Sequence, residues 1–473
     1  MLIERKKETE ILKNALNAKE SRFVAVYGRR RIGKTFLIRE VFGYRFTFQH
    51  AGLSRGTMKD QIFEFVSSLK DSGYKFEKPP KNWLEAFEGL KDVIRNSNEK
   101  KKVIFIDELS WMDTPKSNLI SAIENFWNGF ASARKDVLLI ICASATSWMI
   151  SEVIHNKGGL YHRLTDQIHL SSFSLKECET YIESMGLTMN REQILQYYMI
   201  FGGIPYYWSF IKKGFSLAQN IDNILFAKEA PLKDEYEYLY ASIFKNPEVY
   251  LNIIETLGTK KVGMTREELI EASGIVNSGD LSKKLNELEN CGFIRKYKAF
   301  GNAKKNSVYQ LIDCFTLFYL RFLKNNPTDE HFWTNQINEP KTNTWHGLAF
   351  ERICFDHIEQ IKSKLSIMGV NSEICSWYCK EDLNKGILGS QIDLLIIRKD
   401  MVINLCEIKY SGTQFTVTKK YDEDICKKIN DVKIQAGARY AIFPTLITTY
   451  GLIKNSYSDR FPSVVILDDL FAF

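Results

Sequence analysis

The segment that most constrains the fold of this chain has the pattern G-x-x-x-x-G-K-T. It comprises Gly28, Arg29, Arg30, Arg31, Ile32, Gly33, Lys34 and Thr35. It follows an apolar run at 23–26 and precedes a segment of helical pattern at 36–40. Two glycines allow a tight loop whose backbone N–H groups surround a phosphate chain, while the lysine reaches the phosphates and the threonine ligates Mg²⁺. A glycine turn between a strand and a helix is the alternative, but the full pattern favours a P-loop that binds ATP.

Four apolar segments of strand length alternate with stretches of helical pattern. They lie at 23–26, 46–49, 103–106 and 137–143. This alternation predicts an α/β fold with a parallel sheet covered on both faces. Ligands of such sheets bind at the carboxyl ends of the strands. Gly28, Asp107 and Ser144 each follow a strand, so we expect them to converge on one edge.

The side chains at these strand ends suit nucleotide hydrolysis. Asp107 would hold Mg²⁺ through water, and Glu108 would orient or deprotonate the attacking water. Ser144 would sense the γ-phosphate. Alternatively, Asp107 and Glu108 only begin a surface loop, and Ser144 is only a hydroxyl at a strand end.

Five segments carry a family resemblance over about the first 310 residues. They are YGRRRIGKT, VIFIDE, CASATSW, the L-Y-x-R-L stretch near 160–164, and FGGIPY at 201–206. With them the chain resembles AAA-type ATPases related to origin-recognition and STAND proteins, and more narrowly the archaeal-type ATPases. The resemblance implies that Arg163 is an arginine finger acting on a neighbouring subunit, and hence a homo-oligomer. A surface or ion-pair role for Arg163 is the alternative, and the lid lacks a second sensing arginine beside 201–205.

Residues 249–311 predict a winged helix. Helical patterns at 250–257, 266–272 and 278–289 precede two strands at 293–297 and 307–311. Seven Lys or Arg against three Asp or Glu over 277–310 give a charge of +4, which suits phosphate contacts. The expected DNA contacts are Lys283, Lys284, Arg295, Lys296, Lys304 and Lys305. The alternative is a structural lid without DNA contact.

The C-terminal third contains a second group of charged residues. Asp393 lies in a predicted strand, Glu407 and Lys409 lie in its predicted hairpin partner, and a helix at 347–354 carries a further acid, Glu351. Because strand side chains alternate between faces, Glu407 and Lys409 share one face. The carboxylates would bind Mg²⁺ or Mn²⁺, and Lys409 would position the attacking water or stabilise developing charge.

This D-x13-E-x-K arrangement resembles the PD-(D/E)xK nucleases over about residues 340–445. The resemblance implies that Glu351 is the acid that the family carries on a helix. The usual proline before the aspartate is absent, since Ser390-Gln391-Ile392 stands there. The alternatives are a degenerate binding fold or a surface Glu–Lys pair. Four lysines further on would follow a phosphate backbone or lie on a solvated helix face: Lys419, Lys420, Lys427 and Lys428.

Composition indicates the cellular compartment in which we expect these sites to work. The nine cysteines are scattered, which suits a reducing cytosol. Cys375 and Cys379 have zinc-like spacing, but no second pair follows at finger spacing. No apolar run approaches the ~20 residues that cross a bilayer. We expect a cytoplasmic protein without membrane contact.

Together these patterns predict four parts: an ATPase core at 1–172, a helical lid at 173–245, a winged helix at 246–325 and a nuclease-like domain at 326–473. The predicted function is ATP-dependent DNA processing, in which ATP hydrolysis drives or gates metal-dependent cleavage. The resemblance implies a setting in mobile elements or antiphage defence. The alternative is an ATP-controlled switch that binds DNA or a partner protein and whose nuclease-like domain is inactive. A metabolic kinase is disfavoured because no second small-molecule domain is evident.

Overall fold

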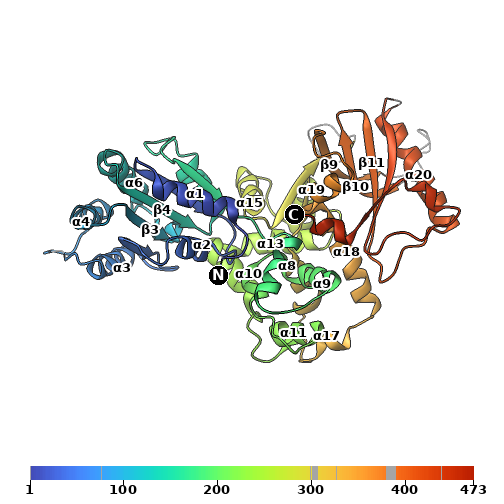
Figure 1. Cartoon of the computed structure of the whole chain (residues 1–473), viewed down its shortest axis with the longest axis horizontal. Helices are drawn as coiled ribbons and strands as arrows, with labels where there is room; N and C mark the ends of the chain where they lie inside the picture. Colours follow the sequence, from blue (N-terminus) through green and yellow to red (C-terminus); the bar gives the residue numbers. More distant parts are fainter. Residues whose placement is uncertain are drawn as a thin grey trace. The chain divides into compact units, whose positions relative to one another are not determined.

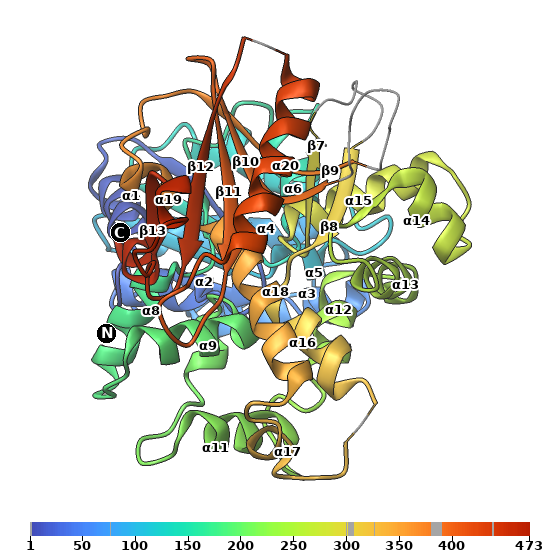
Figure 2. The ribbon, with the colours of Figure 1, turned by 90° about the vertical axis from the view of Figure 1, so that its right-hand side faces the viewer.

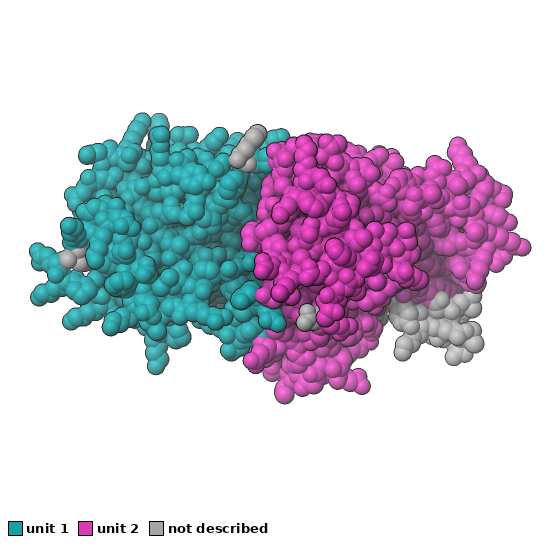
Figure 3. Space-filling view, turned by 90° about the horizontal axis from the view of Figure 1, so that it is seen from below, with its two compact units in different colours: residues 1–172, 237–247, 286–291 teal, residues 173–236, 248–285, 292–473 magenta. Residues whose placement is uncertain are grey.

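The chain forms two compact units in the computed structural model, which describes residues 2–75, 77–298, 300, 307–325, 327–379, 390–437 and 439–473. Unit 1 comprises residues 1–172, 237–247 and 286–291, and unit 2 comprises residues 173–236, 248–285 and 292–473 (Figure 3). The expected four-part division remains a prediction.

Unit 1 is built on a parallel sheet. Its strands are β1 (Arg22–Tyr27), β2 (Phe48–Ala51), β3 (Lys102–Asp107), β4 (Val137–Ala143) and β5 (Asp166–His169). The order β2-β3-β4-β1-β5, with every pair parallel, confirms the predicted sheet type. The second strand begins two residues later than expected, because its pairing with β3 starts at Phe48 opposite Ile104.

Helices cover both faces of this sheet (Figure 1). They are α1 (Lys6–Asn17), α2 (Lys34–Val41), α3 (Met58–Asp71), α4 (Trp83–Asn96), α5 (Leu109–Met112), α6 (Leu119–Phe126) and α7 (Thr146–Trp148), with α12 (Glu235–Ile243) further along the chain. Alternate residues of β1 point to opposite faces. Phe23 and Ala25 join one apolar core with Phe65 and Phe87 of α3 and α4.

Unit 2 begins with the helices α8 (Leu175–Ser184), α9 (Arg191–Phe201), α10 (Pro205–Trp208) and α11 (Leu217–Ile221). The helices α13 (Pro247–Gly258), α14 (Arg266–Ser273) and α15 (Gly279–Asn290) follow. A small antiparallel sheet in the order β6-β8-β7 comprises β6 (Met264–Thr265), β7 (Ile294–Lys298) and β8 (Ser307–Leu311). The helices α13, α14 and α15 and the strands β7 and β8 lie within a few residues of the predicted positions, and their identification as a winged helix remains a prediction.

The C-terminal part of unit 2 contains a mixed sheet in the order β13-β12-β11-β10-β9 (Figure 2). Its strands are β9 (Ser372–Cys379), β10 (Ser390–Arg398), β11 (Val402–Lys409), β12 (Ala441–Thr448) and β13 (Ser463–Ile466). The accompanying helices are α16 (Cys314–Phe318), α17 (Phe332–Asn335), α18 (Pro340–Asp356), α19 (Ile358–Lys364) and α20 (Lys419–Ala436). Strands β9, β10 and β11 are antiparallel, whereas β11, β12 and β13 are parallel.

The strand β7 packs against this mixed sheet. Tyr297 of β7 belongs to the apolar core that Trp377, Ile392 and Leu405 form within the sheet. Its hydroxyl accepts a hydrogen bond from Ser376 Oγ of β9 (2.8 Å). The small β6-β8-β7 sheet is therefore part of the same packed body as the C-terminal sheet.

Candidate functional site

The P-loop connects β1 to α2 in unit 1. Gly28 has a φ of 144°, and a Cβ there would lie 2.3 Å from the Leu170 carbonyl oxygen, so no other residue fits. Gly33 has a φ of 89° and directly precedes Lys34, the first residue of α2. The strand–loop–helix context that the motif requires is present.

Lys34 points into its own loop. Its side chain is largely buried, and Nζ donates hydrogen bonds to the carbonyl oxygens of Gly28 (2.9 Å) and Arg29 (2.9 Å) and to Ser144 Oγ (3.0 Å). The ammonium group is thus held at the carboxyl end of β1 and β4. Phosphate oxygens would be alternative acceptors for the same three N–H donors.

The carboxylates at the end of β3 face the same loop. Thr35 Oγ1 donates a hydrogen bond to Asp107 Oδ2 (2.7 Å). Glu108 accepts from the Ser144 backbone N–H (3.0 Å) and from Ser144 Oγ (2.5 Å). The expected convergence of Gly28, Asp107 and Ser144 is confirmed. It arises because β4, which ends at Ala143 directly before Ser144, lies between β1 and β3.

A hydroxyl and a carboxylate in direct contact are suitable ligands for Mg²⁺, which takes one or two carboxylates together with phosphate and water oxygens. Thr35 and Asp107 fit such an ion.

The Arg30 guanidinium lies 5.5 Å from the ring centre of Trp111. Arg163 lies on an exposed turn of unit 1 and makes no recorded contact with a P-loop residue in the part of the chain described.

The second group of predicted residues lies on β10 and β11 in unit 2. Leu394 pairs with Cys406 in the antiparallel ladder, which sets Asp393 beside the Glu407–Lys409 end of β11. The Ile408 backbone N–H donates to Asp393 Oδ2 (3.3 Å), and Lys409 Nζ lies 3.8 Å from Glu407 Oε2. The expectation that Asp393, Glu407 and Lys409 meet is confirmed.

Two side chains that the sequence did not single out as partners bind Glu407, which is 0% exposed. Lys428 Nζ of α20 lies 2.5 Å from Glu407 Oε1, and the Tyr421 hydroxyl donates to Oε2 (3.2 Å). Burial raises the pKa of Glu407, and the nearby Lys428 ammonium opposes this rise. Lys428 lies three residues after the buried Ile425 on α20, and this helical spacing is the sequence signal that places it on the inner face.

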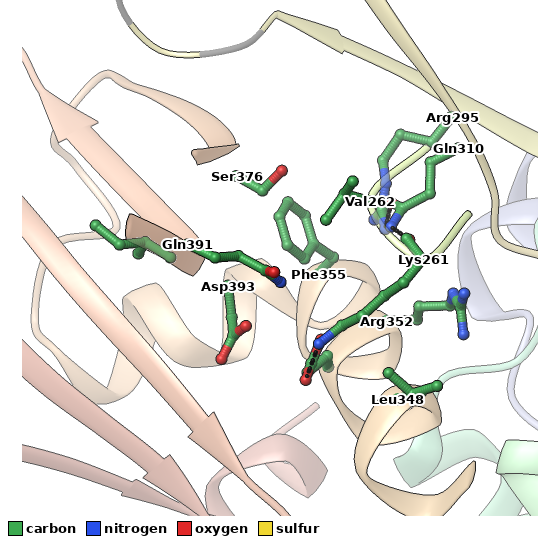
Figure 4. A pocket seen from close by; sticks show the side chains of 12 residues that line it. Lys261, Val262, Arg295, Gln310, Leu348, Arg352, Phe355, Ser376, Gln391 and Asp393 are labelled. Carbon is green, nitrogen blue, oxygen red and sulfur yellow. Dashed lines mark hydrogen bonds and ion pairs between the residues drawn. The ribbon is translucent and has the colours of Figure 1, made fainter. Parts of the chain in front are cut away.

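Glu351 of α18 forms an ion pair with a lysine other than the one that binds Glu407. Lys261 Nζ, from the segment between α13 and β6, lies 2.8 Å from Glu351 Oε1. Burial raises the pKa of Glu351 to about 7, with a further rise from the Asp393 charge and an opposing effect from Lys261. Figure 4 shows Lys261 and Asp393 extending into one pocket from different elements. Ninety residues separate Lys261 from Glu351, and no sequence pattern predicts their contact.

Glu351, Asp393 and Glu407 do not form the expected three-acid metal site. Among the described residues, no three His, Cys, Asp or Glu side chains come close enough to hold one ion. The reason is that Glu351 is engaged by Lys261 and Glu407 by Lys428. Asp393 and Glu407 still provide the one or two carboxylates that Mg²⁺ needs when it keeps several waters.

Of the two cysteines with zinc-like spacing, the structure describes the side chain of Cys375, whereas the side chain of Cys379 lies outside the described residues. Cys375 is buried in the apolar core beside Trp377 and has no metal-binding group around it in the described ranges. Burial raises the pKa of its thiol to about 12, so the thiolate that zinc needs is disfavoured.

The expected DNA contacts differ in their accessibility. Lys283 and Lys296 are exposed. Lys284 pairs with Asp280 (2.5 Å). Arg295 is not available to a DNA backbone, because β7 packs on the C-terminal sheet: its side chain is 18% exposed, lies 3.4 Å from Asp356 and is 4.2 Å from the ring centre of Phe355. Lys304 and Lys305 lie outside the described residues.

None of the described helices is both long enough and apolar enough to cross a membrane.

Comparisons with known proteins assign the N-terminal part. Residues 2–209 match the model of a family described as "ATPase domain predominantly from Archaea". This segment is therefore similar to the ATPase domains of that family. A protein of Methanocaldococcus jannaschii is 24% identical over 447 residues, which cover 93% of this chain and 94% of that protein.

Two solved structures show similarity in their fold. The Walker-type ATPase of Pyrococcus abyssi is 15% identical, with a TM-score of 0.47, over 68% of this chain and 96% of its own. The ORC2 protein of Aeropyrum pernix is 12% identical, with a TM-score of 0.43, over 71% of this chain and 95% of its own.

Proposed function

We propose that this chain is an ATP-hydrolysing enzyme that processes DNA, in which the nucleotide state controls metal-dependent cleavage at a second, nuclease-like site. The match of residues 2–209 to an ATPase family supports the first activity. The observation that carries the second is the buried Glu407 with Asp393 and Lys409 beside it on adjoining strands. A buried carboxylate with nearby lysines is costly to fold and is typical of a functional site.

At the ATPase site, the P-loop N–H groups and Lys34 would bind the ATP phosphates, with Mg²⁺ held by Thr35 and Asp107. Glu108 would accept a proton from the attacking water. Its present hydrogen bonds to Ser144 link it to the residue that Lys34 also contacts. A γ-phosphate would therefore affect Lys34, Ser144 and Glu108 together.

At the nuclease-like site, Asp393 and Glu407 would hold Mg²⁺ or Mn²⁺, which supplies a water of lowered pKa and neutralises phosphate charge. Lys409 would orient the attacking water and stabilise the charge that develops on the phosphate. Lys428 favours the charged form of Glu407 against the effect of its burial. In this proposal Glu351 serves as a peripheral acid and not as a third ligand.

DNA is the proposed substrate, and a homo-oligomer using Arg163 in trans is the proposed assembly. The packing of β7 on the C-terminal sheet supports a structural role for the winged-helix segment, with Lys283 and Lys296 as the described lysines still free to meet DNA.

The test uses purified protein on linear, circular and branched DNA, with Mg²⁺ or Mn²⁺ and with or without ATP. We expect cleavage that Asp393→Ala and Lys409→Ala abolish and that Lys399→Ala, at an exposed lysine, leaves unchanged. If the protein binds DNA but cuts none of these substrates under any of the conditions, the binding-switch alternative replaces this function.

A further inference from the structure

A small pocket of about 20 Å³ that opens to solvent adjoins the nuclease-like carboxylates within unit 2 (Figure 4). Its lining includes three cations, Lys261, Arg295 and Arg352, and extends to Gln391 and Asp393 at the end of the sheet. The segment before β6, the strands β7 and β8, the helix α18 and the C-terminal sheet all contribute to it.

Arg352 is the unusual member of this lining. The residue is 8% exposed, and its Nε has no hydrogen-bond partner among the described residues. The charges of Glu351 and Asp356 act on its guanidinium, but neither carboxylate forms a salt bridge with it. Burying a charge without a partner costs several kcal/mol, and buried polar groups normally have partners. The cost is understandable if an anion that enters the pocket provides the missing partner.

Lys261 is held at the same pocket by its backbone. Gln310 Nε2 donates to the Lys261 carbonyl oxygen (2.8 Å), and the Tyr297 hydroxyl donates to the carbonyl oxygen of Val262 (2.5 Å). The next residue, Gly263, has a φ of +83°, and a Cβ there would lie 2.4 Å from the Tyr309 carbonyl oxygen. The segment is therefore anchored to β7 and β8, and Lys261 presents its ammonium group from a rigid support.

The negative charges nearby are already engaged. Glu351 pairs with Lys261, and Asp356 lies 3.4 Å from Arg295. Asp393 lies at the edge of the pocket that faces Glu407 and Lys409. Arg352 is the cation of this lining without a salt bridge, although Glu351 and Asp356 act on its charge, so an anion beside it would supply the missing direct contact.

We propose that this pocket is a phosphate-binding subsite in which Arg352 and Lys261 hold one phosphate of a nucleic-acid strand. The inference rests on the proposed function and deepens it. Guanidinium binds phosphate oxygens through two parallel hydrogen bonds, and Lys261 adds a point charge. Because Asp393 borders the same pocket, the phosphate held there is a neighbour of the one presented to Asp393, Glu407 and Lys409.

The test measures binding of a fluorescent DNA duplex by the full chain in EDTA, so that it does not depend on cleavage. Arg352→Met and Lys261→Met should each weaken binding about tenfold. Each should reduce the slope of log K against log[salt] by about 0.9, the loss of one phosphate contact. The matched controls are Lys260→Met, whose lysine pairs with Glu268 on the surface, and Arg321→Met, whose arginine is exposed. Both controls should bind as the unmodified chain does.

Thermal unfolding without DNA separates binding from a structural role. Arg352→Met removes a buried unpaired charge, so its Tm should equal or exceed that of the unmodified chain. If Arg352→Met does not fold, Arg352→Lys replaces it. This variant keeps the charge without the two-pronged geometry and should bind DNA with intermediate affinity.

Several outcomes overturn the inference. One is that Arg352→Met binds DNA with the affinity and the salt slope of the unmodified chain. If the chain still cleaves DNA in that case, the inference fails but the proposed function stands. Another is a Tm shift by inorganic phosphate that Arg352→Met abolishes while DNA binding is unchanged, since the pocket then takes free phosphate and not a strand. Conversely, the chain could bind DNA in an Arg352-dependent manner without cutting it under any condition. This result supports the phosphate subsite and contradicts the nuclease activity.

Discussion

Glu407 is the most enclosed carboxylate of the proposed nuclease-like site, and its charge depends on α20, the helix that follows β11 in the chain. Its two oxygens face Lys428 at 2.5 Å and the Tyr421 hydroxyl at 3.2 Å, whereas Lys409 is more distant at 3.8 Å. A carboxylate removed from water needs such partners to stay ionised. Burial raises the pKa of Glu407 and Lys428 opposes this rise, so Lys428 favours the charged form that a metal ion would require.

Removing Lys428 should destabilise the protein measurably. Lys428→Met leaves Glu407 buried with a weaker partner, so we expect a loss of about 1–3 kcal/mol in the free energy of unfolding. Lys427→Met is the control, because Lys427 pairs with Asp424 on the exposed side of α20 and should change stability by less than about 0.5 kcal/mol. Urea unfolding of both variants measures the difference, and Glu407→Gln should relieve most of it. Equal stability of the two lysine variants contradicts the assigned role of Lys428.

The residues that the sequence revealed differ physically from those it missed. Asp393, Glu407 and Lys409 were predictable because strand alternation determines which side chains share a face. For Lys428 the sequence suggests a contact with a phosphate backbone or a solvated helix face, although its spacing from Ile425 indicates the inner face of α20. Lys261 could not be predicted, because its contact with Glu351 depends on how two separate segments pack.

At the ATPase site, Lys34 and Glu108 should have separable effects. Lys34→Ala removes the ammonium group from the P-loop and should abolish ATP binding. Glu108→Gln preserves an acceptor for Ser144 but loses the base, so ATP should bind while hydrolysis slows 10²- to 10⁴-fold. Nucleotide titration and phosphate release measure the two effects. Full turnover by both variants would remove the ATPase assignment from these residues.

Among the elements of unit 2, α8 and α18 are joined by one imidazole. His357, directly after α18, accepts a hydrogen bond at Nε2 from the Leu175 backbone N–H (3.1 Å) at the start of α8. Its Nδ1 lies 2.9 Å from the Ile353 carbonyl oxygen, which can only accept, so the ring is neutral with the proton on Nδ1. Burial lowers the pKa of His357 to about 4. Protonation would eliminate the Nε2 acceptor that connects the two helices.

This histidine should make stability depend on pH. The unfolded chain binds a proton at His357 near pH 6.5, whereas the folded chain does so only near pH 4. The stabilisation from the neutral His357 is therefore complete above pH 6.5 and is lost as the pH falls toward 4. At pH 5 the free energy of unfolding should be about 2 kcal/mol lower than at neutral pH. His357→Gln keeps an acceptor without titrating, so its Tm should fall less between pH 7 and pH 5.

The exposed His155 provides the control, because its replacement by Gln should leave the pH profile unchanged. His50 and His346 are also buried, with pKa values lowered to about 4, so part of the acid sensitivity should remain in His357→Gln. An identical pH profile in His357→Gln and the unmodified chain would show that the α8–α18 connection does not titrate.

The β7–β8 hairpin shows the limit of element prediction. Its two strands were predictable from their apolar patterns and the loop between them. Its packing on the C-terminal sheet was not, because Tyr297 meets Trp377 and Leu405 from a distant part of the chain. The +4 charge of residues 277–310 consequently overstated the cations available to DNA, since Arg295 is enclosed by Phe355 and Asp356.

At the scale of the whole molecule, each of the two units is assembled from separate stretches of the chain. The chain passes from one unit to the other after residues 172, 236, 247, 285 and 291. Unit 1 therefore contains two short segments from the later part of the sequence, and neither unit is a simple consecutive half. This connectivity could not be predicted from local patterns, which favoured four consecutive parts.

The assembly of several chains gives the last prediction. Arg163 is exposed in unit 1 and makes no recorded contact with its own P-loop among the described residues, as expected of an arginine that acts on a neighbour. ATPase rate per chain should therefore rise with protein concentration as the oligomer forms. Lys34→Ala and Arg163→Ala should each be inactive alone. Mixed together, some interfaces pair an intact P-loop with an intact Arg163, so phosphate release should return to a fraction of the unmodified rate. The exposed Arg55→Ala is the control and should remain fully active alone. A monomer with a concentration-independent rate, or a mixture as inactive as its components, contradicts an Arg163 role in trans.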